Sequence, residues 1–145
     1  MPDLTGGQPM EIGLISIYIG AILTLFLAIF HTRFYKLFQW KGEFQKISVL
    51  NRRVLYTVHV ALFLLFFLFA FISFTYAREL SKSEGLAFGV NIAYSAFWLW
   101  RAIWQIYYFP PSKGRRPSPI WYAMVISFFV LFVAYLIPVL SSLLT

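Results

Sequence analysis

The chain has no cysteine, so disulfide bonds, thiol catalysis and thiolate metal sites are all excluded. Acidic residues are nearly as scarce, with five Asp and Glu against 12 Lys and Arg. Charged residues of both signs make up 12% of the chain, about half the roughly 25% that is usual in soluble domains. This shortage argues against a water-soluble protein, because so few polar residues could not cover helices that are apolar on all sides.

Long apolar blocks account for most of the chain, and hydrophobic residues reach 61% of the total. Each block has about 20 or more residues with almost no charge, which is enough to cross a ~30 Å hydrocarbon core as a helix. The blocks cover about 12–32, 54–77, 87–109 and 119–143. We therefore expect an all-α fold: a transmembrane four-helix up-down bundle that forms a single integral membrane domain over residues 1–145.

The basic residues gather in the connections between these blocks, and their positions predict the orientation. Nine of the 12 lie in two connections: Arg33, Lys36, Lys41, Lys46, Arg52 and Arg53 in the first, and Lys113, Arg115 and Arg116 in the third. An excess of Lys and Arg in short loops marks the cytoplasmic side. We therefore expect an N-out/C-out protein whose inner loops contact the anionic headgroups of the lipid bilayer. The same distribution argues against a nucleic-acid partner, despite the net charge of +7.

The first connection, residues 33–53, mixes aromatic residues with lysines. Phe34, Leu37 and Phe38 recur at helical spacing beside Lys36. This pattern is typical of an amphipathic piece that lies on the inner leaflet. It fits equally well an extension of the preceding helix beyond the membrane.

Polar side chains follow one face of the 87–109 helix. At steps of three and four residues this face carries Asn91, Tyr94, Trp98, Arg101, Gln105 and Tyr108. Lipid cannot satisfy such a polar seam, so we expect it to face other helices or a water-filled cavity.

Small residues follow one narrow face of the expected 12–32 helix. The face consists of Gly13, Ser16, Gly20, Thr24, Ala28 and His31. Small residues at this spacing allow helices to approach closely. We therefore expect His31 to point inward together with them.

Arg101 is the one charged residue inside the four blocks, and it lies roughly 13 Å from the inner end of its helix. An arginine at the centre of a span costs about 2.5–3.5 kcal/mol on insertion scales, so the protein must supply partners for it. No acid lies in any block, and Glu43 in the first connection is the nearest acid by expected depth. Three interpretations stay open: Arg101 reaches a lipid phosphate or Glu43, it belongs to a ligand or transport site, or it contacts a partner subunit.

The two histidines, His31 and His59, fall at a depth in the cytoplasmic leaflet similar to that of Arg101 and Gln105. Two histidines could ligate the iron of haem b, hold a metal ion with a third ligand, hydrogen-bond a quinone or relay protons. A metal site would lack further ligands except Glu43. A hydrogen-bonded histidine without a special role is the simplest interpretation.

Several of these residues also form a pattern along the chain. It consists of His31 at the end of the first block, Trp40 and Glu43 in the inner connection, Leu50-Asn51-Arg52 before the second block, and the W-x-x-R-x-x-x-Q motif of Trp98, Arg101 and Gln105. Over the first three spans this pattern resembles that of uncharacterised small bacterial four-span integral membrane proteins. The resemblance implies a four-span fold in a bacterial cytoplasmic (inner) membrane, and it implies no activity. His59 is not part of the pattern.

No enzyme class is indicated, because the chain has no nucleophile elbow, HExxH motif, Gly-rich phosphate loop or pair of membrane carboxylates. We expect a non-catalytic membrane protein, a subunit of a larger membrane assembly, whose pocket in the cytoplasmic leaflet binds an anionic or redox ligand such as a lipid headgroup, a quinone or haem. The candidate pocket residues are Arg101, Gln105, His31, His59, Trp98, Tyr94, Asn91 and Glu43. The alternative is a small homo-oligomeric channel or transporter for a proton, ion or small solute that uses the polar seam. A membrane-embedded enzyme also stays open.

Overall fold

The computed structural model describes residues 8–111 and 116–144, and within these ranges every regular element is an α-helix. In chain order the helices are α1 (Gln8–His31), α2 (Phe34–Leu37), α3 (Trp40–Glu43), α4 (Val49–Thr75), α5 (Ala77–Lys82), α6 (Gly85–Tyr107) and α7 (Pro119–Leu144). The all-α class expected from the sequence is confirmed. Lys113 and Arg115, two basic residues of the third connection, lie outside the described residues.

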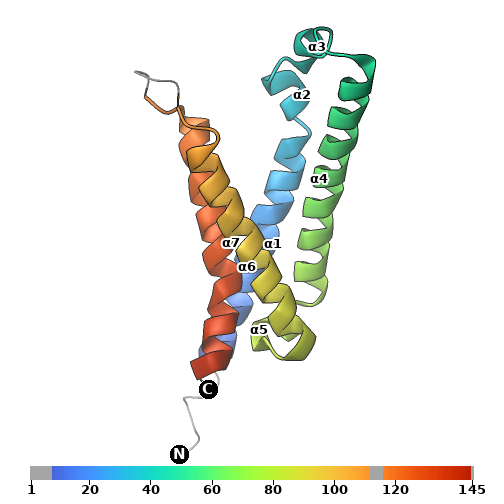
Figure 1. Ribbon diagram of the computed structural model, residues 1–145. Coiled ribbons are helices and arrows are strands. Elements are labelled where there is room, and N and C mark those ends of the chain that lie inside the picture. Colours follow the sequence, from blue (N-terminus) through green and yellow to red (C-terminus); the bar gives the residue numbers. More distant parts are fainter. Residues whose placement is uncertain (1–7, 112–115, 145) are drawn as a thin grey trace, which may run out of the picture.

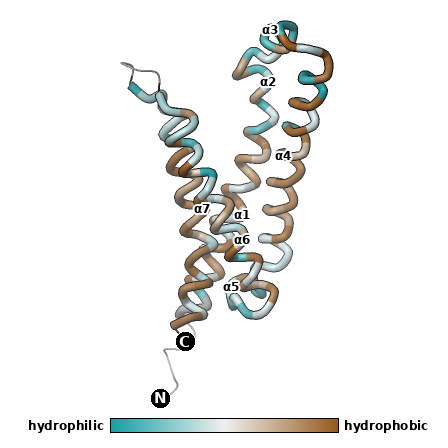
Figure 2. Tube along the Cα trace, viewed as in Figure 1, coloured by the Kyte–Doolittle hydropathy of each residue, from teal (hydrophilic) through white to brown (hydrophobic). Residues whose placement is uncertain are grey.

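Within the described residues, three helices are long and apolar enough to cross a membrane: Glu11–His31 within α1, all of α4 and all of α7. Hydrophobic residues run along the middle of the long helices, whereas hydrophilic ones gather around α3 and α5 (Figure 2). The helix α6 has a similar length but a less apolar composition, so the four spans expected from the sequence become three clear ones. The chain is therefore a membrane protein whose fourth long helix carries polar residues.

Two of the long helices begin at serine caps. Ser48 Oγ accepts a hydrogen bond of 3.2 Å from the backbone N–H of Asn51, so α4 begins at Val49 rather than near residue 54. Ser118 Oγ accepts an equal bond from the N–H of Trp121 at the start of α7. The helix α1 ends at His31, so the first connection is a separate pair of short helices and not an extension of α1.

The four long helices form two pairs that meet at one end and diverge at the other (Figure 1). The helix α1 packs against α4 and α7, and α6 packs against α7. The short helix α5 closes the narrow end, because it contacts α1, α4, α6 and α7. Between α4 and α6 the contacts are made by long aromatic side chains, such as Phe69 and Tyr94, whose stacked ring centroids lie 4.0 Å apart. At the wide end, near α2 and α3, residues of both pairs line a cleft.

The small-residue face of α1 forms the middle of the core. Its members are buried, as their spacing predicts: Gly13, Ser16, Gly20, Thr24, Ala28 and His31. Tyr135 of α7 fills the space over Gly20, where an added Cβ would lie 2.9 Å from a carbon of the tyrosine ring. The Tyr135 hydroxyl also shares a buried hydrogen bond of 2.7 Å with Ser73 Oγ of α4. One side chain therefore links α7 to both α1 and α4.

We expect Gly20→Ala to destabilise the protein by about 1–3 kcal/mol, because the added methyl group would overlap the Tyr135 ring. Gly89→Ala on α6 is the matched control. No neighbouring atom lies within 4 Å of its added Cβ, and alanine favours a helix more than glycine does, so this variant should be slightly more stable. Unfolding by SDS in mixed micelles measures both changes. Equal stability of the two variants would mean that α1 and α7 do not meet closely at Gly20.

Candidate functional site

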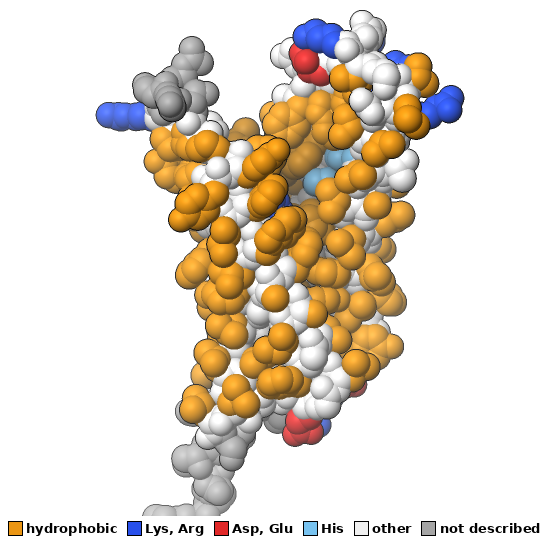
Figure 3. All heavy atoms as spheres, in the orientation of Figure 1, with side chains coloured by type: hydrophobic (Ala, Val, Ile, Leu, Met, Phe, Trp, Pro, Cys, Tyr) orange, Lys and Arg blue, Asp and Glu red, His pale blue; other side chains and the backbone are white. Residues whose placement is uncertain are grey.

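Two neighbouring cavities occupy the cleft between the helix pairs. The α4–α6 cavity, of about 440 Å³, lies beside α1 between α4 and α6. The α2–α7 cavity, of about 680 Å³, lies between the α2–α3 segment and the start of α7. Both volumes fall within the range of roughly 300–1,000 Å³ that is usual for ligand pockets. Figure 3 shows the hollow in a space-filling view, with histidine side chains between hydrophobic ones.

The two cavities share one stretch of wall. The residues that line both are Phe30, Phe34, Trp40, Arg101, Phe109 and Met124. Among the described residues, Arg101 is the one charged residue of this shared wall, and Gln105, one turn further along α6, lines the α2–α7 cavity beside it. The cleft therefore combines a single shared cation with a large apolar surface.

The Arg101 guanidinium has aromatic neighbours but, within the described residues, no hydrogen-bond or ion-pair partner. Its Cζ lies 4.7 Å from the centroid of the Phe128 ring and 5.8 Å from that of Trp100. Cation–π contacts of this kind contribute about 0.5–2 kcal/mol, but they leave the five N–H donors of the group unsatisfied. A half-buried guanidinium in this state still requires an acceptor.

The acid expected nearest to Arg101 has a different partner. Glu43 lines the α2–α7 cavity together with Arg101, but its carboxylate forms an ion pair of 2.8 Å with Nζ of Lys46. Both of these side chains are more than half exposed, so the pair contributes at most about 1 kcal/mol. Glu43 therefore does not neutralise Arg101 in this structure.

The two histidines lie face to face on the wall of the α4–α6 cavity, with ring centroids 4.5 Å apart and planes inclined by 14°. His31 is only 8% exposed, and its Nε2 has no hydrogen-bond partner among the described residues. Phe34 packs against His31 and Trp40 against His59, at centroid distances of 4.3 and 4.8 Å. Arg101 lines the same cavity as His31. The cavity thus holds an unsatisfied imidazole nitrogen near a cation.

This arrangement does not fit a bis-histidine haem or a metal centre. Axial ligation directs two nitrogen lone pairs at an iron between the rings, and these lone pairs lie in the ring planes. The stacked rings of His31 and His59 instead present their faces to each other. Within the described residues, no group of three or more His, Cys, Asp or Glu could hold a metal ion. The geometry therefore favours the lipid-headgroup and quinone interpretations over haem.

The polar seam of α6 has two halves with different surroundings. Asn91, Tyr94 and Trp98 are buried against protein and line neither cavity of the cleft. Arg101 and Gln105, nearer the wide end, are half-buried and line the cleft. The inward direction expected for the seam is thus confirmed for these residues, but only the second half reaches a cavity.

Packing accounts for much of the first half of the seam. The Nδ2 of Asn91 donates hydrogen bonds to the Leu80 carbonyl at 2.8 Å and to Ser83 Oγ at 3.2 Å. These bonds satisfy the C-terminal end of α5 and hold it against α6. Tyr108, which the spacing places on the seam, is 63% exposed, because α6 ends at Tyr107. Its expected place in the seam is wrong.

Most of the aromatic residues that enclose the cleft were not among the residues predicted from the sequence. Phe97, Trp100 and Trp104 of α6 line the α4–α6 cavity. Their spacing of three and four residues is a signal that could have found them. Phe34 and Trp40 lie over the histidines, although the expected surface helix would place Phe34 against the inner leaflet. No local pattern predicts how the chain turns between α1 and α3.

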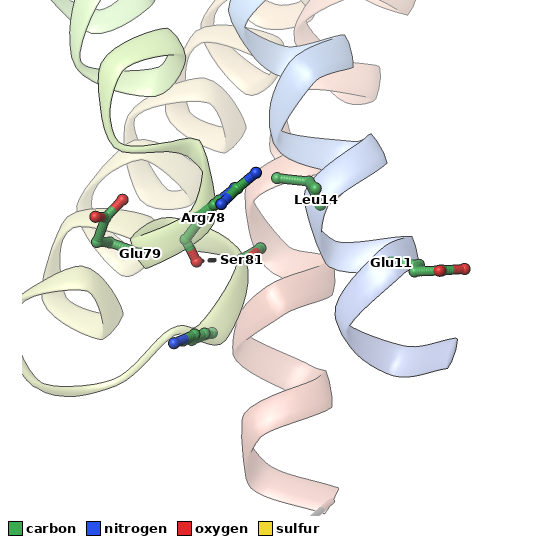
Figure 4. Close-up of a pocket in the computed structure, with 6 residues that line it drawn as sticks. Glu11, Leu14, Arg78, Glu79 and Ser81 are labelled. Carbon is green, nitrogen blue, oxygen red and sulfur yellow. Dashed lines mark hydrogen bonds between the residues drawn. The ribbon is translucent and has the colours of Figure 1, made fainter. Parts of the chain in front are cut away.

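A further cavity, of about 520 Å³, lies at the narrow end between the start of α1 and α5 (Figure 4). The Arg78 side chain reaches toward α1, while the side chains of Glu11 and Glu79 point away from Arg78. Ser81 Oγ donates a hydrogen bond of 2.8 Å to the backbone oxygen of Arg78. All the charged side chains that line this cavity are exposed, so water satisfies them and the geometry assigns the cavity no ligand.

The chain matches no protein-family model, no curated protein and no solved structure. The resemblance to small bacterial four-span proteins therefore stays a prediction.

We expect the purified protein to show no Soret absorption band, because the stacked rings of His31 and His59 cannot ligate one iron from opposite sides. Visible spectra of protein produced with added haem precursor check this. A Soret band that disappears in both His31→Ala and His59→Ala would contradict the geometry.

Proposed function

We propose that this protein is a non-catalytic membrane protein that binds an anionic amphiphile, with an oxyanion head and an apolar tail, in the cleft at its inner end. The observation that carries the proposal is Arg101, a half-buried cation without an acidic partner among the described residues, on the wall that two apolar cavities share. Partial burial of a guanidinium is costly, and cation–π contacts offset only part of the cost. An oxyanion head supplies both the missing charge and the missing acceptors.

His31 supports the same class of ligand. Its Nε2 is buried without a partner, and a neutral imidazole donates or accepts one hydrogen bond at that atom. A head bound between Arg101 and His31 would satisfy both groups, while the aromatic walls would enclose the apolar tail. A neutral quinone suits the cleft less well, because it brings no negative charge to Arg101.

The channel or transporter alternative has less support. A conducting path along α6 requires water beside the polar seam over its whole length. Asn91, Tyr94 and Trp98 instead pack against protein in the half nearer the narrow end. A homo-oligomer and a role as a subunit of a larger membrane assembly, both expected from the sequence, stay predictions.

We also propose that α6 crosses the membrane, which gives four crossings in up-down order with both termini outside. Its 23 residues extend about 35 Å at 1.5 Å per residue, enough for the hydrocarbon core. Its exposed faces carry apolar residues such as Ile92, Leu99 and Ile103. The basic residues of the first connection lie around α2 and α3, and the positive-inside rule places that end in the cytoplasm of a bacterial cell.

The absence of cysteine permits a direct test of this orientation. In spheroplasts, we expect Lys82→Cys to react with a membrane-impermeant maleimide, and Lys36→Cys to react only after lysis. Both lysines are exposed, so neither change should disturb packing. Labelling is read as a mass shift. The reverse pattern would place α2, α3 and the cleft on the outer side.

We expect Arg101→Gln to lower the retention of phosphatidylglycerol about tenfold, because the change removes the cation and keeps a polar side chain. Arg33→Gln is the matched control, since it removes one exposed arginine at the same end of the molecule and lines neither cavity. Native mass spectrometry counts the lipids that remain after release from nanodiscs of phosphatidylglycerol and phosphatidylcholine. The proposal fails if Arg101→Gln retains as much phosphatidylglycerol as Arg33→Gln.

A further inference from the structure

We infer that the ligand carries two apolar chains on one anionic head, as an anionic phospholipid does, with one chain in each cavity of the cleft. This inference rests on the proposed function, because it requires the head to bind at Arg101. Beyond the proposed function, it specifies that the cleft selects a ligand with two apolar chains.

The walls beyond the shared stretch belong to different helices. The α4–α6 cavity continues between Val58 of α4 and Trp104 of α6. The α2–α7 cavity continues between Leu37 of α2 and Ile120 of α7. Both cavities include Arg101, so two apolar spaces extend from one cation along different helices.

Polar groups line the cleft near the place where the cavities meet, whereas other buried polar groups without a partner, such as those of Tyr94 and Trp98, line neither cavity. Arg101 lines both cavities, with His31 in one and Gln105 in the other. Glu43 and Ser118 also line the α2–α7 cavity, but their polar atoms are already engaged in an ion pair and in the cap of α7. The cleft therefore offers one site for an oxyanion and two spaces for apolar chains.

The covalent link between two chains favours a ligand that fills both spaces. Once the head is bound at Arg101, entry of the second chain is intramolecular, at an effective concentration set by the short link through the head. A ligand with one chain would leave the walls of the other cavity without its van der Waals contacts, unless a second molecule entered. The basic residues around α2 and α3 favour an anionic lipid at this end over a neutral one.

The experiment compares ligands that differ in the number of chains. Delipidated protein in a mild detergent is titrated separately with phosphatidylglycerol, lysophosphatidylglycerol and oleate, and native mass spectrometry reports the bound fraction. We expect phosphatidylglycerol to bind about tenfold or more tightly than either single-chain ligand, because only it occupies both cavities from one head.

Two tryptophan variants test the two cavities separately. Val58→Trp narrows the α4–α6 cavity and Ile120→Trp narrows the α2–α7 cavity, and both positions are about half exposed, so the core is not overpacked. Val60→Trp and Ile126→Trp are the controls, since they add the same ring at exposed positions of α4 and α7 that line neither cavity. We expect each cavity variant, and neither control, to weaken phosphatidylglycerol binding about tenfold.

Equal affinities for phosphatidylglycerol and its lyso form would overturn the two-chain inference. A loss of affinity in only one of the two cavity variants would overturn it as well. Both results leave the proposed function in place if Arg101→Gln still lowers the retention of phosphatidylglycerol about tenfold relative to Arg33→Gln. Failure of the proposed function has a separate signature, in which Arg101→Gln and the unmodified protein bind phosphatidylglycerol equally well.

Discussion

The close contact between Gly20 of α1 and Tyr135 of α7 is the constraint on which the arrangement of the long helices depends. Helices inside a bilayer gain nothing by moving apolar groups away from lipid, so they associate through close packing and buried hydrogen bonds. Gly20 leaves room for the tyrosine ring, and the hydroxyl of that ring reaches Ser73 of α4. Three helices are joined at one level of the core, and α5 joins all four long helices at the narrow end.

The cleft forms where this tight packing between the helix pairs ends. Toward the wide end, the small-residue face of α1 finishes at His31, which stacks on His59 of α4 and not on a residue of α7. The helices α6 and α7 stay together, but no glycine contact of this kind holds them to α1 at that level. The pairs diverge toward the wide end (Figure 1). Arg101 and Gln105 therefore line the cleft between the pairs. The same α6 seam is thus structural at one end and available for a ligand at the other.

The large share of aromatic residues, 21% of the chain, has a structural explanation in this divergence. Where α4 and α6 are too far apart for small side chains to touch, rings such as Phe69 and Tyr94 bridge the gap. Nearer the wide end, further rings line the cavities and surround the Arg101 guanidinium without supplying an acceptor. An electropositive group enclosed by aromatic faces, with no embedded acid to neutralise it, is the chemical basis of the proposed affinity for an anionic head.

The length of the apolar blocks was enough to predict the long helices, and periodicity within one helix predicted the inward faces of α1 and α6. Those features depend on the spacing of residues along a single helix, and the spacing is written in the chain. The positions of Gly20 and Asn91 in the core followed from it directly. The less apolar composition of α6 is also visible in the sequence, since it comes from the seam itself.

Contacts between helices decided which of these inward-facing residues are packed and which line the cleft. Tyr94 meets Phe69 and is packed, whereas Arg101 on the same face meets a cleft, and nothing in the spacing of α6 distinguishes the two. Glu43 falls at the depth expected of a partner for Arg101, but it pairs with Lys46, three residues away. The stacking of the two histidines likewise depends on how α1 and α4 are rotated toward each other. Rotation and separation of helices are set by the packing of all of them at once, so no local pattern could specify them.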